Sequence, residues 1–129
     1  MNLLISLQGI PPPKKNSRCL FSHKGKIFNI PSMRYRTWHR QVALALACYP
    51  KITDNIKEVF ITFHMPDHRR RDLTNCAESL LDALVDNKII ADDCWQVIPK
   101  ITLISAGVNK QYPHTEISIY GHAEIDDMG

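Results

Sequence analysis

Residues 65–97 read MPDHRRRDLTNCAESLLDALVDNKIIADDCWQV, and this stretch decides the fold and the chemistry of the chain. It contains a run of cations, Arg69-Arg70-Arg71, and changes to a carboxylate at Asp72. Guanidinium groups clamp phosphates in a bidentate manner, whereas carboxylates hold hard divalent cations. A site of this composition could bind a nucleic-acid backbone and also cleave it.

The segment from Asp72 to Lys88 is predicted to be a helix, because its apolar residues recur at intervals of three and four. These apolar residues are Leu73, Cys76, Ala77, Leu80, Leu81 and Leu84. The opposite face carries Asp72, Asn75, Ser79, Asp82 and Asp86, with Glu78 on its shoulder, and three of these acids, Glu78, Asp82 and Asp86, are spaced by four residues. Asp72 occupies the N-cap position, where its charge favours the positive end of the helix. We interpret Asp82 and Asp86 as part of a solvated helix face.

Two adjacent carboxylates, Asp92 and Asp93, follow this helix after a short turn. They can reach the start of the helix only if the following strand lies beside that start. The alternative is that they are ordinary loop residues that open a turn. For Asp72 a functional role is favoured, since an N-cap alone does not explain three arginines directly before it.

One longer motif joins these residues: His64-Met65-Pro66-Asp67, the basic run, Asp72-Leu73-x-Asn75, Leu81-Asp82-Ala83-Leu84 and Asp92-Asp93-x-x-Gln96-Val97. The motif resembles that of the RusA family of Holliday-junction resolvases, and the resemblance extends over nearly the whole chain. It implies a small homodimeric endodeoxyribonuclease of bacteria or their prophages, which resolves four-way DNA junctions in recombination and repair. It also implies Mg²⁺ as cofactor, with Mn²⁺ able to substitute, and a metal site that includes Asp72 and Asp93.

Two positions depart from the family pattern. Thr74 stands where the family has a second aspartate, and Glu78 stands where it has a catalytic lysine. A threonine hydroxyl is a weak neutral ligand, so Glu78, one turn further along, can restore the missing charge. We therefore predict that Asp72, Glu78 and Asp93 are the catalytic metal ligands, with Asp92 as a further ligand.

Two alternatives to a nuclease stay open. The first is a catalytically impaired, structure-selective DNA-binding protein of the same fold, which the exchanges at Thr74 and Glu78 favour. The second is a protein-interaction domain whose acidic helix meets a basic partner. Metal-dependent cleavage distinguishes the enzyme from the first alternative, and DNA binding of any kind distinguishes it from the second.

Phosphate contacts are predicted in two places. Lys14, Lys15 and Asn16 follow a run of three prolines, and the resemblance implies that this segment lies near the active site, where a lysine could replace the absent catalytic one. The second group is Arg69, Arg70, Arg71 and Asn75. The alternatives are a basic surface loop for residues 14–16 and a second capping group for Asn75.

Composition limits the class of protein. The chain has 129 residues, of which 44% are hydrophobic, so we expect one domain over residues 1–120 and a polar tail over 121–129. The formal net charge of +3 is too small to identify a nucleic-acid binder by itself, but the cations are clustered. The four cysteines have no paired spacing and there is no secretory signal or long apolar span, so we expect a cytoplasmic protein without membrane contact. The spacing of the histidines makes a zinc site unexpected.

The periodicity predicts an α+β fold, with a mainly antiparallel sheet and two longer helices packed on it. Strands are expected at residues 3–7, 58–64, 97–105 and 115–120, and a hairpin at 18–29. Ser32 is predicted to cap the other helix, which should end near Cys48.

Overall fold

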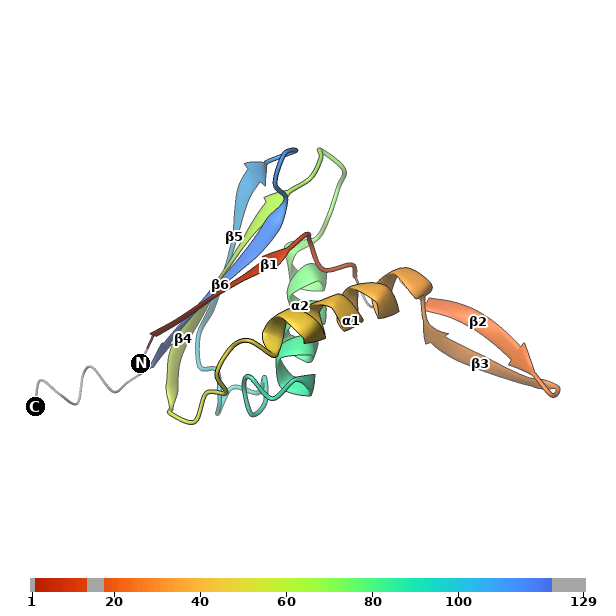
Figure 1. Ribbon diagram of the computed structural model, residues 1–129, viewed down its shortest axis with the longest axis horizontal. Coiled ribbons are helices and arrows are strands. Elements are labelled where there is room, and N and C mark those ends of the chain that lie inside the picture. The colour runs from red at the N-terminus through yellow and green to blue at the C-terminus, as the bar shows by residue number, and fades with distance from the viewer. Residues whose placement is uncertain (1, 14–17, 122–129) are drawn as a thin grey trace, which may run out of the picture.

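A four-stranded sheet, in the order β1-β6-β4-β5, forms the centre of the computed structural model (Figure 1). The structure describes residues 2–13 and 18–121. The strands are β1 (Asn2–Gln8), β4 (Ile56–Met65), β5 (Ile101–Val108) and β6 (His114–Gly121). β6 pairs antiparallel with both β1 and β4, whereas β4 and β5 are parallel. The expected mainly antiparallel α+β fold is confirmed.

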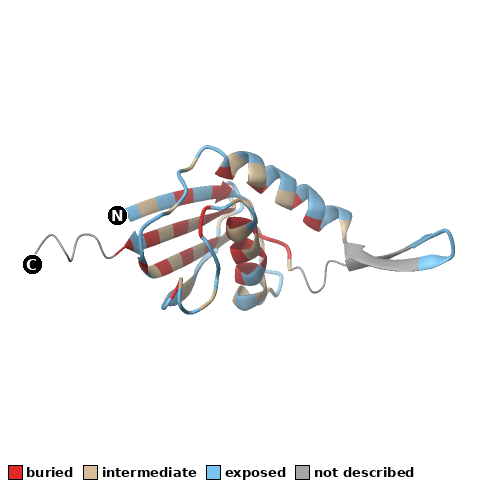
Figure 2. Ribbon diagram, turned by 90° about the horizontal axis from the view of Figure 1, so that it is seen from below, coloured by how far each residue is buried: buried red, intermediate tan, exposed pale blue. Residues whose placement is uncertain are grey.

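The central strands β4 and β6 alternate between a buried and a less buried face, as a half-buried sheet should. Val59, Ile61 and Phe63 of β4 and Ile117 and Ile119 of β6 point to the core and are at most 1% exposed. The other face of the sheet carries the alternate residues. Figure 2 shows this alternation as stripes along the strands.

Two helices, α1 (Met33–Leu46) and α2 (Leu73–Asp86), cover the core face of the sheet. Ser32 caps α1, since its hydroxyl oxygen accepts a hydrogen bond from the backbone N–H of Tyr35 at 3.2 Å. The N-cap residues of the two helices, Ser32 and Asp72, are the ones predicted from the sequence. The buried face of α2 includes Cys76, Ala77, Leu80, Leu81 and Leu84, as the apolar spacing predicted. Neither helix is long and apolar enough to cross a membrane.

A separate hairpin, β2 (Arg18–His23) and β3 (Lys26–Pro31), projects from the start of α1 away from the main sheet (Figure 1). Its turn residues Lys24 and Gly25 have positive φ angles of 52° and 77°, the conformation that tight hairpin turns require. The predicted hairpin is therefore confirmed, and it forms a two-stranded sheet of its own.

The segment before β5 differs from the prediction. We expected a strand from Val97, but Val97 and Ile98 donate backbone hydrogen bonds to the carbonyl of Cys94, and β5 begins only at Ile101. Pro99 lacks the N–H that a ladder uses, which explains why no strand forms across it. Ile98 is buried, so its apolar character reports core packing and not a strand.

Candidate functional site

An arginine-rich pocket of about 340 Å³ lies at the start of α2. We call it the arginine pocket, and it is lined by residues 10–13, 34, 69–72, 75 and 76. It joins the proline segment, the first turn of α1, the basic run and the start of α2. Four arginines face a single carboxylate there, so the pocket suits an anion such as a phosphate. Five predicted site residues meet in it: Arg69, Arg70, Arg71, Asp72 and Asn75.

Asp72 sits at the N-cap of α2, but its side chain makes no capping hydrogen bond. Its Oδ2 atom instead accepts a hydrogen bond from the side-chain amide of Asn75 at 3.3 Å. The carboxylate is exposed and borders the pocket. The carboxylate of Asp72 is therefore not engaged in helix capping, and its oxygen atoms can bind a cation.

Arg71 is held by a partner in its own chain. Its Nη1 atom donates to Oδ1 of Asp67 at 2.7 Å, and the Arg71 side chain is only 18% exposed. The Arg71 hydrogen bond, with a second from the backbone N–H of Arg69, lowers the pKa of Asp67 to about 2. Arg71 thus shapes the loop, while Arg69 and Arg70 are exposed and better placed to meet an external phosphate.

A buried hydroxyl fixes the proline segment to α2. Ser79 is fully buried and its Oγ donates to the carbonyl of Pro12 at 2.6 Å. This contact joins residues 67 positions apart and holds Pro12, which lines the arginine pocket, against α2. Lys14, Lys15 and Asn16 lie outside the described residues, but the segment that leads to them borders the pocket.

The acid pair, Asp92 and Asp93, does not line the arginine pocket. The backbone N–H of Asp93 donates to Oδ1 of Asp92 at 2.7 Å, and both residues are exposed. Desolvation, and then the Asp92 side chain, raise the pKa of Asp93; the charge of Asp82 acts in the same direction. Asp93 therefore lies within electrostatic reach of Asp82, which is ten residues beyond Asp72, or about 15 Å along the helix axis.

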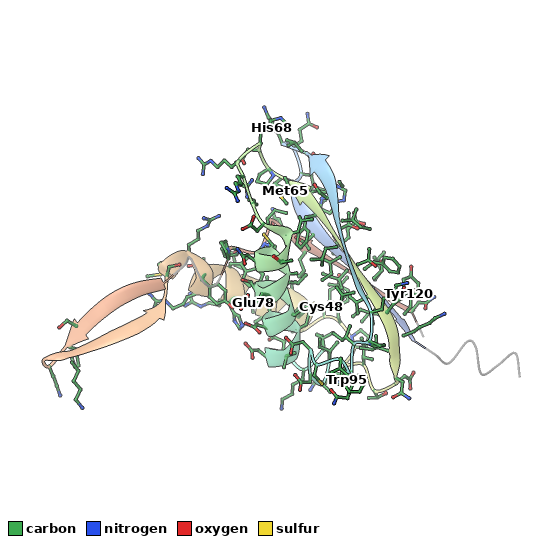
Figure 3. The ribbon with its side chains drawn as sticks, turned by 180° about the vertical axis from the view of Figure 1, so that it is seen from behind. Cys48, Met65, His68, Glu78, Trp95 and Tyr120 are labelled. Carbon is green, nitrogen blue, oxygen red and sulfur yellow. The ribbon has the colours of Figure 1, made fainter. Side chains whose placement is uncertain are left out.

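The predicted metal ligands thus divide between the two ends of α2. Figure 3 shows His68, just before the helix, at one end of the molecule and Trp95, just after Asp93, at the other. Glu78 lies between them on an exposed position of α2. Within the described part of one chain, Asp72, Glu78 and Asp93 do not form a group with ligand atoms within 4.8 Å of one another.

The comparison with protein families bears on this site. The model of the family described as endodeoxyribonuclease RusA matches residues 10–120 of the 129-residue chain. The chain belongs to the RusA family. No curated protein matches the chain closely enough to be named as a relative. The RusA match includes the whole arginine pocket, α2 and the acid pair, so the pocket is part of an endodeoxyribonuclease fold.

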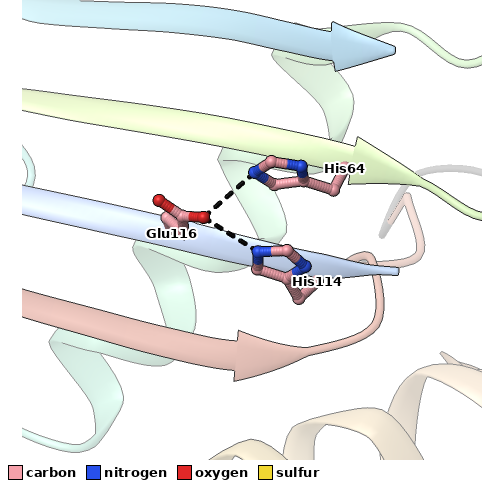
Figure 4. A group of neighbouring side chains, drawn as sticks. All are labelled: His64, His114 and Glu116. Atoms are coloured by element: carbon pink, nitrogen blue, oxygen red, sulfur yellow. Dashed lines mark hydrogen bonds and ion pairs between the residues drawn. The ribbon is translucent and has the colours of Figure 1, made fainter. Parts of the chain in front are cut away.

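The chain also contains a group of side chains that the sequence interpretation missed. Among the described residues, only His64, His114 and Glu116 bring three potential metal ligands within 4.8 Å of one another (Figure 4). Hydrogen bonds to the Tyr112 carbonyl and to Glu116 raise the pKa of His114. The hydrogen bond from His114 lowers the pKa of Glu116, and the charge of His64 adds to this effect. The signal available was His114-x-Glu116 on an alternating strand, but His64 could be added only once the strand order was known.

Two further residues gain importance from the RusA geometry. Arg34, in the first turn of α1, lines the arginine pocket. Asp82, interpreted from sequence as part of a solvated helix face, lies within electrostatic reach of Asp93. Asp86, on the same helix, contacts Nε2 of His39 at 3.1 Å.

Proposed function

We propose that the protein is a Mg²⁺-dependent endodeoxyribonuclease that cuts four-way DNA junctions as a homodimer. The observation that supports this most directly is the arginine pocket, which is lined by four arginines and by Asp72, an N-cap residue whose side chain makes no capping hydrogen bond, in a chain of the RusA family. Recombination or repair in a bacterium or prophage, in the cytoplasm, is the setting that the family resemblance suggests.

The side chains fit a metal-dependent phosphodiester cleavage. Carboxylate oxygens are the ligands that Mg²⁺ takes, and Asp72, Glu78 and Asp93, with Asp92, would hold it. When bound, such an ion supplies charge stabilisation at the phosphoryl group and an activated water. Arg69 and Arg70 are exposed beside Asp72 and would hold the phosphate in the arginine pocket.

A second copy of the chain would complete the metal site. Ligand oxygens around one Mg²⁺ lie about 3–4 Å apart, because each Mg–O bond is about 2.1 Å. In the described part of one chain, Asp72 lies at the start of α2, whereas Asp93 lies near Asp82 in the second half of the helix. We propose that, in a C2 dimer, the acid pair of each subunit approaches Asp72 of the other. Such a dimer has two equivalent sites, which suits two symmetric cuts in a junction.

The first experiment compares cleavage of a four-way junction, a flap and a linear duplex, with Mg²⁺, with Mn²⁺ and with EDTA. The proposal expects metal-dependent cuts in the junction and little cleavage of the duplex. Glu78→Ala tests the compensation for Thr74, and its cleavage rate should fall while junction binding persists. A junction left intact with both metals would support the alternative, a structure-selective DNA-binding protein of the same fold.

A second experiment tests the shared site by mixing two inactive variants, Asp72→Asn and Asp93→Asn. If the site is shared, the mixed dimer retains one complete site, with Asp72 from one chain and Asp93 from the other. It should therefore nick one strand, although each variant alone is inactive. If each chain forms its own site, the mixed dimer has no complete site and no nicking returns. That second result would leave the nuclease proposal intact and reject only the shared arrangement.

A further inference from the structure

A compact group of His64, His114 and Glu116 lies on the sheet face away from α2, apart from the arginine pocket (Figure 4). His64 and His114 are direct partners in the register of β4 and β6, and Glu116 is two residues beyond His114 on the same face. Nε2 of His64 lies 3.0 Å from Oε1 of Glu116, and Nε2 of His114 lies 2.8 Å from the same atom. One carboxylate oxygen therefore meets two ring nitrogens.

The hydrogen bonds of His114 determine what its Nε2 atom can offer. Nδ1 lies 2.8 Å from the carbonyl oxygen of Tyr112, which can only accept, so Nδ1 carries a hydrogen. In the neutral ring Nε2 then presents a lone pair to Glu116, which is also an acceptor. The contact is favourable only when a proton or another cation lies between the two atoms.

The second ring, that of His64, contacts the same carboxylate oxygen of Glu116. His64 and His114 stack with ring centroids 3.9 Å apart and planes inclined by 8°. Without a metal, a protonated His114 ring and a neutral His64 ring that carries its proton on Nε2 can both donate to Glu116, so a divalent cation would have to replace these two protons. A single divalent cation bound to both Nε2 atoms and to Oε1 would satisfy all three groups at once.

The surroundings also resemble those of a metal site. A histidine ligand usually donates its other ring N–H to a backbone carbonyl or a carboxylate, which fixes the tautomer and the ring orientation. The Tyr112 carbonyl does this for His114, and the Tyr112 ring stacks on the same imidazole at 4.4 Å. The His114 side chain is 10% exposed, while Glu116 is 40% exposed. The ligands are therefore oriented on the protein side and open to solvent on the other.

We propose that His64, His114 and Glu116 bind one divalent transition-metal ion, with Zn²⁺ the best match. Two imidazoles and one carboxylate are a known zinc ligand set, whereas Mg²⁺ and Ca²⁺ take oxygen ligands. Bonds of about 2.1 Å in a tetrahedral site place ligand atoms about 3.4 Å apart. Because an imidazole binds a metal in its ring plane, His64 would have to turn out of its stack with His114, which Tyr112 holds in place, to direct its Nε2 lone pair at the ion. The fourth position is left for water or another small ligand.

The site has a defined structural consequence. It would tie β4 to β6 immediately before Met65, whose carbonyl accepts a hydrogen bond from the Asn109 N–H at 2.7 Å. Two loops begin here, residues 66–72 with the basic run and residues 109–113. An ion at this position would stiffen the base of the loop that forms the arginine pocket, without being part of the carboxylate site.

The test is a titration of the full chain with Co²⁺, a spectroscopic substitute for Zn²⁺, in the presence of millimolar Mg²⁺. We expect one equivalent to bind with d–d absorption of a nitrogen- and oxygen-ligated ion, and Zn²⁺ to displace it. His64→Gln and Glu116→Gln should each weaken binding at least tenfold. Zn²⁺ should also raise the melting temperature of the wild type and not that of Glu116→Gln.

The matched control is His39→Gln, because His39 also contacts a carboxylate, Asp86, but without a second histidine in the group. This variant should bind Co²⁺ like the wild type. Circular dichroism and melting without metal show whether each variant is folded. Intense thiolate charge-transfer bands, or one-equivalent binding that persists in folded Glu116→Gln and His64→Gln, would overturn the proposal. Absence of saturable binding by the wild type would overturn it as well.

Discussion

The side-chain amide of Asn75 donates a hydrogen bond to Oδ2 of Asp72 at 3.3 Å, across the first turn of α2. The Asp72 side chain makes no capping hydrogen bond, and the Asn75 contact orients its carboxylate at the edge of the arginine pocket. Asn75 thus contacts the carboxylate that we propose as a metal ligand, while its part in DNA binding stays a prediction.

Replacing Asp72 should separate binding from cleavage. Asp72→Asn keeps a good N-cap residue and the shape of the side chain, so the fold should be retained. It removes the charge that would hold a cation, and we expect cleavage to fall by about 100-fold or more while junction binding persists or tightens. Gel shifts without metal and single-turnover cleavage with Mg²⁺ measure the two effects. Asp86→Asn on the same helix is the control, and normal cleavage by Asp72→Asn would exclude the proposed site.

Junction affinity should depend steeply on salt, because phosphate binding releases counterions. Arg69→Ala and Arg70→Ala each remove an exposed cation at the arginine pocket. We expect each to reduce the slope of log K against log salt by about 0.9. Lys57→Ala, an exposed cation at the other end of β4, should leave the slope unchanged. A slope that is flat in the wild type would argue against backbone binding.

Removing the Ser79 hydroxyl should destabilise the protein. Ser79→Ala leaves the buried Pro12 carbonyl without this donor, a loss of about 1–3 kcal/mol in the free energy of unfolding. Urea denaturation measures it. Thr37→Ala on the exposed side of α1 should change the free energy by less than about 0.5 kcal/mol. Equal stability of the two variants would show that the proline segment is not fixed through Ser79.

Lowering the pH should remove the contribution of ionised Asp67 to the stability of the folded state. Folding lowers its pKa from the ordinary value of 3.8 to about 2, so the folded state favours the ionised form. The stabilisation is present above pH 3.8 and disappears as the pH falls towards 2. Asp67→Asn should therefore melt below the wild type at neutral pH, and the two melting curves should converge near pH 2. Asp54→Asn, in an exposed loop, provides the comparison, and a difference that persists at pH 2 would contradict the assignment.

The sequence predicted the elements well because their signals are local. The apolar spacing of α2, the Ser32 cap and the hairpin turn at Lys24-Gly25 each depend on neighbouring residues. The predicted start of β5 was wrong. Ile98 is buried in a turn, and an apolar residue in the sequence does not show whether a strand or a turn will bury it.

The site could be predicted only for residues that are neighbours in the sequence. Arg69 to Asp72 are neighbours in sequence, so their common pocket followed from the motif, whereas Arg34 comes from α1 and could not be assigned to it. The shared use of Asp72 and Asp93 depends on how α2 spans the molecule and stays a prediction. His64 meets His114 through the pairing of β4 with β6, a register between strands far apart in sequence.

The hairpin formed by β2 and β3 pairs only with itself and extends from the first turn of α1. Its turn, residues 22–26, is exposed. A probe attached at this tip should leave the core undisturbed, since the exposed turn projects away from the main sheet (Figure 1). A fluorophore at His23 would therefore report, through its quenching or depolarisation, whether this arm touches DNA when the body of the protein binds.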